Sequence, residues 1–182
     1  MASRVCTLTI ALAAAALAAG CFDFGMPDRA EADCLDDDSD ACWQRLSPAE
    51  TMSWADALDY CDNMGLGGLD WRFPDIDELR GLVEGCDDVE TGGACAVTEE
   101  CLASSCATAE CAGCASGGGE GYAGCYWDQD VEGACYCYWS SSTYDDSSMT
   151  AWTVDFSTGS VAGRDKSDWC YARCVADTSS GE

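Results

Sequence analysis

The chain of 182 residues is long enough for one ordinary domain with extensions, and it combines a formal charge of −26 and 16 cysteines with a complete lack of histidine. This acidity argues against nucleic acid, heparin-like polymers and anionic membrane surfaces as partners, and the missing imidazole excludes Ser/His/Asp or Cys/His catalysis and histidine-ligated zinc. The cysteine content is typical of a disulfide scaffold, which persists only in an oxidising compartment.

Residues 1–20 have the pattern of a signal peptide. After a short basic start comes the apolar run VCTLTIALAAAALAAG, which is shorter than the about 20 residues that a spanning helix needs. The end of this run, LAAGC, resembles the bacterial lipobox, whose cysteine carries lipid and becomes the new amino terminus. Cys21 would then anchor the protein. Because the leucine is displaced to Leu17, ordinary cleavage near Ala19, with Cys21 as a bridge partner, is the alternative.

The cysteine count favours the lipid-bearing interpretation. If Cys6 leaves with the signal peptide and Cys21 carries lipid, an even number of cysteines remains (16 − 2 = 14). A free Cys21 would leave one thiol without a partner. Phe22 follows in place of aspartate, and in lipoproteins this usually permits sorting to the outer membrane. We therefore expect an outer-membrane lipoprotein that faces an oxidising compartment.

Residues 21–41 have the composition of an acidic tether with little hydrophobic periodicity. The alternating aspartates at positions 36, 38 and 40 invite a calcium-loop hypothesis. However, Ala41 stands where an EF-hand loop needs glycine, and Ser47 stands where it needs glutamate. We favour a solvated spacer that is closed by a bond between Cys34 and Cys42, with no metal.

The globular domain is expected over residues 42–176, with a short tail at 177–182. CWQRL alternates as an opening strand does. In SWADALDYCDNMG the apolar residues recur at helical spacing, with Ser53 as the expected N-cap and Gly65 as the stop. This helix would place Cys61 on its buried face.

The stretch LDWRFPDIDELRGL predicts a corner between a strand and a helix. Trp71 and Phe73 share one face of the strand, and Arg72 takes the other. After the proline, Asp75 can cap the helix, with Glu78 completing a capping box. We expect Arg72 to be held by a carboxylate or by carbonyl groups rather than by substrate. The buried stripe of the helix would be Ile76, Leu79 and Val83.

The terminal block predicts an antiparallel sheet, because CYCYWSSSTY, AWTVDF, SVAG and WCYARCVA alternate and STGS forms a tight turn. Cys170 could then neighbour the strand at 135–140, so we expect it to bond to Cys135 or Cys137. Rings at period-two spacing are more often core than a sugar-stacking platform. The rings concerned are Trp139, Trp152 and Trp169.

Two ordered blocks, SWADALDYCDNMGLGGLDWRFPDIDELRGLV and YWSSSTYDDSSMTAWTVDFSTGSVAGRDKSDWCYARCV, resemble the Lcl C-terminal domain family of bacterial extracellular modules. They cover most of residues 42–85 and 138–175. The resemblance implies an α+β fold that is C-type lectin-like, with two helices and a twisted antiparallel sheet. It also implies a disulfide from Cys61 to Cys174 that brings the ends of the domain together.

Between these blocks, residues 86–137 form a disulfide-rich insertion with nine of the fourteen cysteines and few long aliphatic side chains. Disulfides should therefore define it. Because nine is odd, at least one bridge must leave the insertion, and Cys170 is the natural recipient. The spacing CAGC at Cys111 and Cys114 raises redox chemistry or zinc as hypotheses, but structural disulfides are favoured because no second well-spaced pair accompanies it.

In lectin-like domains, ligands generally meet the long loop between the halves of the sheet. The resemblance therefore points to the insertion and to the loop SSTYDDSSM, with Tyr144, Asp145 and Asp146 as candidate ligand-binding residues. The Glu-Pro-Asn, Gln-Pro-Asp and Trp-Asn-Asp motifs of calcium-dependent lectins are absent. The founding family member binds sulfated glycosaminoglycans through a basic surface, and we reject sulfated polyanions here because 34 acidic residues face 8 basic ones.

We therefore expect a lipid-anchored surface module that binds an extracellular protein or glycan, without catalysis, cofactor or metal. The alternative is a structural envelope lipoprotein with no dedicated ligand. A third hypothesis is an enzyme that uses paired carboxylates. Two carboxylates converging in a pocket would favour the enzyme, an exposed aromatic patch on the insertion would favour binding, and a sealed surface would favour the structural role.

Overall fold

The computed structural model describes residues 34–36 and 41–177. The expected signal peptide, the lipidation residue Cys21, most of the acidic tether and most of the tail lie outside the described residues. None of the helices in the described part is long and apolar enough to cross a membrane.

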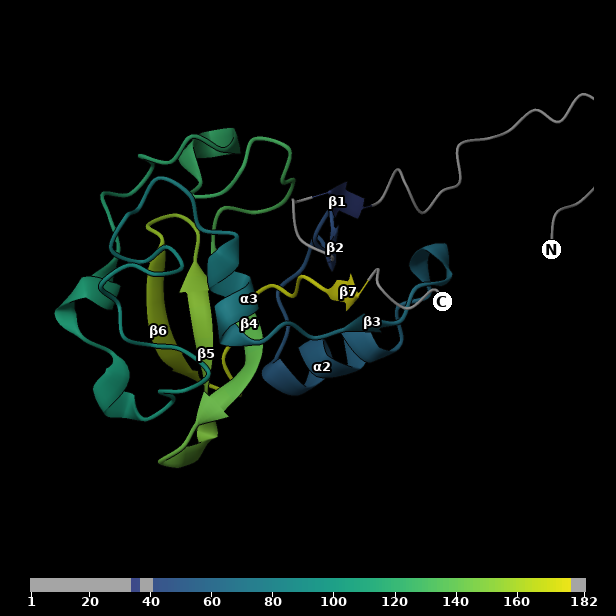
Figure 1. Cartoon of the computed structure of the whole chain (residues 1–182). Helices are drawn as coiled ribbons and strands as arrows, with labels where there is room; N and C mark the ends of the chain where they lie inside the picture. The colour runs from purple at the N-terminus through teal and green to yellow at the C-terminus, as the bar shows by residue number, and fades with distance from the viewer. Residues whose placement is uncertain (1–33, 37–40, 178–182) are drawn as a thin grey trace, which may run out of the picture.

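The described chain is an α+β domain with two antiparallel sheets (Figure 1). The first sheet has the strand order β1-β2-β7-β3, and its strands are β1 (Cys34–Asp36), β2 (Ala41–Gln44), β7 (Val175–Asp177) and β3 (Trp71–Arg72). The second has the order β4-β5-β6, with β4 (Cys137–Tyr144), β5 (Ser147–Asp155) and β6 (Ser160–Asp165). Cys34 pairs with Gln44, so the last part of the expected spacer belongs to a sheet.

The C-terminal segment joins the two sheets. The amide of Trp139 donates to the carbonyl of Tyr171 at 3.0 Å, and the amide of Tyr171 donates to the carbonyl of Cys137 at 2.9 Å. Farther along, the amide of Gln44 donates to the carbonyl of Cys174 at 2.9 Å. The stretch WCYARCVA is therefore not one continuous strand, because it leaves β4 and then pairs with β2 and β3 as β7.

Helix α2 (Trp54–Asp62) begins at the expected N-cap, Ser53, whose hydroxyl accepts from the amide of Asp56 at 3.3 Å. It ends before the expected stop at Gly65. The reason is local, because the Asn63 side chain donates to the Asp59 carbonyl at 2.7 Å and its own amide caps the last turn. Gly65 instead precedes the short 3₁₀ turn η1 (Leu66–Gly68).

Helix α3 (Ile76–Gly81) begins with the expected capping box: the amide of Glu78 donates to Asp75 Oδ1 at 2.8 Å, and the amide of Asp75 donates to Glu78 Oε2 at 2.9 Å. The same Glu78 carboxylate receives both terminal nitrogens of Arg72, at 2.7 and 2.6 Å. Arg72 also donates to Asp177 at 2.8 Å. A carboxylate pair therefore holds Arg72, as expected, and ties the corner to β7.

The insertion wraps around the second sheet (Figure 1) and shares its core. Val89, Val97 and Trp127 are fully buried, and the Trp127 ring lies 4.7 Å from that of Phe156. Disulfides are therefore only part of what orders the insertion, since its few large apolar residues reach the core beside β5. Its short 3₁₀ turns are η2 (Ser104–Cys106), η3 (Ala109–Ala112) and η4 (Tyr122–Gly124).

All cysteines from residue 34 onward are paired. The bonds are Cys34–Cys42, Cys61–Cys174, Cys86–Cys114, Cys95–Cys111, Cys101–Cys106, Cys125–Cys135 and Cys137–Cys170. Cys170 takes Cys137 rather than Cys135, and it is this bond that leaves the insertion. Cys111 and Cys114 bond to different partners, so they are structural and form neither a redox pair nor a zinc site.

Two of the three terminal tryptophans lie in the core. Trp139 and Trp152 are fully buried, and their indole nitrogens donate to the carbonyls of Met52 and Leu102 at 2.9 and 3.2 Å. The expectation was wrong for Trp169, which is 64% exposed. It directly follows a turn in which the amide of Asp168 donates to the Asp165 carbonyl, before the chain enters the sheet.

Candidate functional site

The expected ligand-binding residues lie at the hairpin between β4 and β5. Tyr144 is half-buried, with its ring 4.2 Å from that of Trp152. Asp145 and Asp146 are exposed, and Asp146 accepts from the amide and the hydroxyl of Ser104, the latter at 2.5 Å. These bonds hold the pKa of Asp146 below its usual range. Asp145 and Asp146 therefore fasten the insertion to the sheet, whereas Tyr144 packs within the sheet, and none of the three lines the pocket described next.

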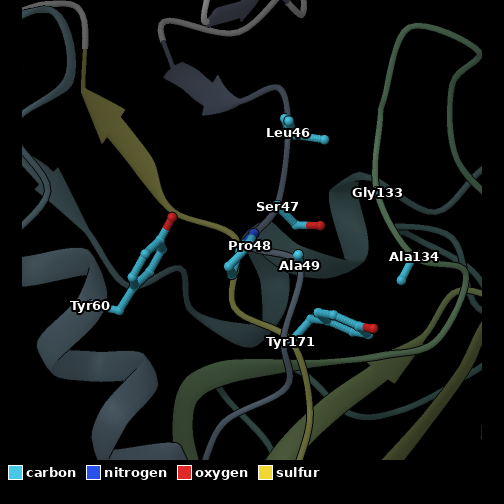
Figure 2. Close-up of a pocket in the computed structure, with 8 residues that line it drawn as sticks. All are labelled: Leu46, Ser47, Pro48, Ala49, Tyr60, Gly133, Ala134 and Tyr171. Atoms are coloured by element: carbon cyan, nitrogen blue, oxygen red, sulfur yellow. The ribbon is translucent and has the colours of Figure 1, made fainter.

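A pocket of about 440 Å³ opens where four separate segments meet. Figure 2 shows the loop of residues 46–49 between Tyr60 of α2 and the 133–134 end of the insertion, with Tyr171 from the C-terminal segment. The lining residues are Leu46, Ser47, Pro48, Ala49, Tyr60, Gly133, Ala134 and Tyr171. No acidic or basic side chain is among them.

Hydrogen bonds inside the protein already engage two of the lining hydroxyl groups. The Tyr138 hydroxyl donates its proton to the carbonyl of Ala134 at 3.0 Å, so Ser47, whose Oγ lies 2.9 Å from it, must donate to Tyr138. On the other side, Tyr60 accepts from the Gln44 side chain at 2.8 Å. These bonds fix the shape of the pocket and leave a mostly apolar face toward solvent.

A buried arginine lies behind one wall of the pocket. The Arg173 side chain is fully buried, and its guanidinium donates to three backbone carbonyls: Gln44 at 2.5 Å, Arg45 at 2.8 Å and Glu132 at 2.7 Å. Burial lowers the pKa of this guanidinium, although an arginine stays charged in proteins. No carboxylate of the described chain forms an ion pair with Arg173.

Aromatic rings share in stabilising this charge. The guanidinium carbon of Arg173 lies 5.1 Å from the centre of the Trp127 ring and 5.4 Å from that of Tyr138. The neighbouring positive charge and the bond from Ser47 favour ionisation of the Tyr138 hydroxyl, but burial dominates, so the pKa of Tyr138 is raised. The tyrosine therefore remains neutral and serves as a hydrogen-bonding support for the wall.

Gly133, a lining residue, packs directly against the groups behind this wall. Its φ is +148°, and a Cβ atom there would lie 2.8 Å from the Tyr138 hydroxyl and 2.9 Å from Arg173 Nη2. Real Cβ contacts are essentially never that short, so only glycine fits. A side chain at this position would displace the Arg173 guanidinium, the Ser47 hydroxyl or the pocket itself.

The pocket continues into an exposed apolar strip. Leu46 at one end is 61% exposed, and Tyr136, 46% exposed, lies edge-on to Tyr171 with ring centres 6.3 Å apart. The surface at the pocket is therefore open rather than sealed. One of its exposed rings, Tyr136, belongs to the insertion. Among the described residues, no group of three or more cysteine, aspartate or glutamate side chains is placed to hold a metal ion.

Sequence reasoning missed this site because its lining comes from parts of the chain far apart in sequence. Tyr60 and Tyr171 are separated by more than half of the chain and are brought together only by tertiary contacts. One signal was available: Arg173 belongs to the terminal motif YARCV, which carries part of the family resemblance. A charged residue between two buried cysteines needs buried hydrogen-bond partners, and these are the backbone carbonyls of the pocket wall.

These features define a disulfide-stabilised α+β domain with an open pocket free of charged side chains. The sequence model of the Lcl C-terminal domain family matches residues 33–176, and the chain belongs to this family. The match begins before residue 42 and includes strand β1. No curated protein matches the chain.

Proposed function

We propose that this protein is a lipid-anchored cell-surface module that binds an extracellular ligand, with the pocket as its binding site. The observation that carries the proposal is a preformed pocket of about 440 Å³, lined by two tyrosines and small apolar residues. A concave, mostly apolar surface on a rigid scaffold is the usual form of a binding site. The rings supply contact area, and the disulfides on both sides limit the entropy that binding would cost.

The seven disulfides support a location in an oxidising compartment outside the cytoplasm. The LAAGC motif at Cys21 and the following Phe22 support lipidation and placement in the outer membrane. Two helices beside antiparallel sheets, with a bond from α2 to the C-terminal segment, support a C-type lectin-like arrangement. On this proposal, the lipid places the domain at the cell surface, where its pocket can meet a partner.

Binding is favoured over catalysis because the pocket lining contains no pair of carboxylates that could act as acid and base. It is favoured over a purely structural role because the surface is open and its apolar strip is exposed at Leu46 and Tyr136. The structural envelope lipoprotein without a dedicated ligand is the competing function, and it predicts that filling the pocket changes nothing.

An adhesion assay on a Gram-negative host that expresses the full chain tests the proposal. Ala49 is exposed and lines the pocket, so Ala49→Trp fills the pocket without touching the core. Ala162 is exposed on β6 and is not a lining residue of the pocket, so Ala162→Trp is the matched control. The surfaces are coated with extracellular protein or with glycan. We expect cells that express the wild-type chain or Ala162→Trp to stay bound to them, and cells that express Ala49→Trp to wash off.

The Ala49→Trp strain and two further strains, one without the protein and one with Cys21→Ala, separate the alternatives. If Ala49→Trp cells adhere as well as wild type, the pocket is not the binding site and the proposal fails. If deletion of the protein changes envelope sensitivity to detergent while adhesion never depends on it, the structural role is correct. Cys21→Ala should release the protein from the membrane fraction, and retention of this variant would refute lipid anchoring.

A further inference from the structure

We infer that the occupant of the pocket is an extended segment of a partner protein in which an apolar residue is flanked by lysine or arginine. This inference rests on the proposed function and names the class of partner for the same site. It follows from the charges around the pocket, from the charge behind its wall and from the hydrogen-bonding groups that the lining leaves available.

Three acidic residues border the pocket from three different segments. Glu50 follows the lining residue Ala49, Asp59 precedes Tyr60, and Glu132 precedes Gly133. Consecutive Cα atoms are about 3.8 Å apart, so the backbone of each acidic residue lies beside the lining, and we call these three positions the rim. All three are exposed, and none forms an ion pair within the described chain. Arg45, the neighbour of Leu46, is the basic residue in the same position; it is half-buried and donates to the carbonyl of Cys34. With three exposed carboxylates against it, the rim is negative and attracts cations, and the overall charge of −26 reinforces that attraction at long range.

The buried guanidinium fixes where the cations of a ligand can lie. Arg173 Nη2 donates to the Glu132 carbonyl directly behind Gly133, so a positive charge pushed against this wall would meet a like charge that solvent screens poorly. An apolar group in the same place meets Leu46, Ala134 and the tyrosine rings instead. A ligand with an apolar centre and basic flanks would place its apolar group against the wall and its positive charges beside the acidic residues of the rim.

The lining favours a polypeptide over a sugar. Sugar recognition needs several directional hydrogen bonds, but the lining includes no Asn, Asp, Gln or Glu side chain, and Ser47 already donates its proton to Tyr138. Tyr60 accepts from Gln44, which leaves the protons of Tyr60 and Tyr171 as the lining's side-chain donors. Apolar rings and Pro48 instead match aliphatic or proline side chains, as aromatic grooves for extended peptides do. The exposed strip from Leu46 to Tyr136 gives such a chain room to continue beyond the pocket.

A selection with a random dodecapeptide phage library, panned on the purified full chain, tests the inference. We expect enriched peptides to share an apolar or proline residue flanked by lysine or arginine. A synthetic peptide of the consensus should lose at least tenfold in affinity with Ala49→Trp and retain it with Ala162→Trp. Added salt should weaken its binding, since the rim attraction is electrostatic.

Matched charge variants isolate the role of the rim. Glu50→Gln with Glu132→Gln should weaken the consensus peptide by roughly threefold to tenfold, whereas Glu100→Gln with Glu120→Gln, equally exposed but away from the pocket, should leave it unchanged. Enrichment of acidic or uncharged peptides, the absence of any enrichment, or indifference to the rim variants would overturn the inference. If cell adhesion still requires the open pocket in that case, the proposed function stands and only the partner class fails.

Discussion

Cys61, on the buried face of α2, is bonded to Cys174, which directly precedes β7, although 113 residues separate them. Tyr60 is the chain neighbour of Cys61, and Tyr171 belongs to the same C-terminal segment as Cys174. The bond therefore fixes the helix and the segment that contribute the two rings of the pocket. It also joins the beginning and the end of the domain. The bond therefore contributes to the stability of the fold and to the geometry of the pocket.

Removal of this disulfide should cost more stability than removal of a short-range one. The chain-entropy model gives about 4 to 5 kcal/mol for a loop of this length and about 2 kcal/mol for the five-residue separation of Cys101–Cys106. We expect Cys61→Ala with Cys174→Ala to lower the free energy of unfolding in urea by more than Cys101→Ala with Cys106→Ala. Equal losses would mean that the long bridge does not restrain the unfolded chain as proposed.

The wall of the pocket should tolerate no side chain at Gly133. Because a Cβ there would meet Tyr138 and Arg173 within 3 Å, Gly133→Ala should lower the free energy of unfolding by about 1 to 3 kcal/mol. Gly65 has a negative φ and nothing within 4 Å of its Cβ direction, so Gly65→Ala is the matched control and should be nearly neutral. If Gly133→Ala left the free energy of unfolding unchanged in the same urea titration, the wall would not be packed against Arg173.

The second buried arginine should be the anchor of the insertion. Arg80, 3% exposed, donates to the carbonyls of Val89, Val97 and Glu90. Arg80→Met would leave these carbonyls short of donors, at a cost of about 2 to 4 kcal/mol. We expect faster amide hydrogen exchange in the insertion and little change in α2. Arg164→Met, at a half-buried position of β6, controls for loss of an arginine. If amide protection in Arg80→Met were unchanged in the insertion, or fell equally in the insertion and in α2, the anchoring role would be contradicted.

The contact between Arg72 and Asp177 should make stability depend on acid pH. Its hydrogen bond lowers the pKa of Asp177, so the folded state holds this proton less tightly than the unfolded state does. The contribution is present above the unfolded pKa of about 3.9 and is lost as pH falls through the lower folded pKa. An NMR titration should place Asp177 below its ordinary range in the wild type and return it there in Arg72→Gln, whereas Arg164→Gln should not move it.

Local features of the fold were predictable because short-range chemistry determines them. The N-cap at Ser53 and the capping box of Asp75 and Glu78 follow from side chains that reach backbone groups within one turn. The alternation in AWTVDF placed Trp152 in the core for the same reason, since strand periodicity is local. The restraint of Arg72 by a carboxylate was also foreseeable, because Glu78 lies only six residues on, in the first turn of the helix after the corner.

Features that depend on distant segments were not predictable in this way. The packing of the insertion on the sheet was not predictable, because its buried residues, such as Trp127, find their partners at Tyr138 of β4 and at Phe156, directly after β5. Strand β1 was not predictable, because three residues show no periodicity and become a strand only by pairing with β2. The partners of the hairpin residues were not predictable either: Tyr144 packs on Trp152 of β5 and Asp146 bonds Ser104 of the insertion, and a ligand at this hairpin stays a prediction. The pocket required four segments to be placed at once.

Site-specific photo-crosslinking in living cells tests most directly whether the pocket is the binding site. A photoreactive phenylalanine analogue would replace Ala49 in the pocket of the full chain, and in a second strain it would replace Ala162 on β6. The account predicts a discrete covalent adduct from position 49 under conditions of adhesion, and none from position 162. Equal adducts from both positions, or none from position 49 while the cells adhere, would contradict the claim that the pocket binds the partner.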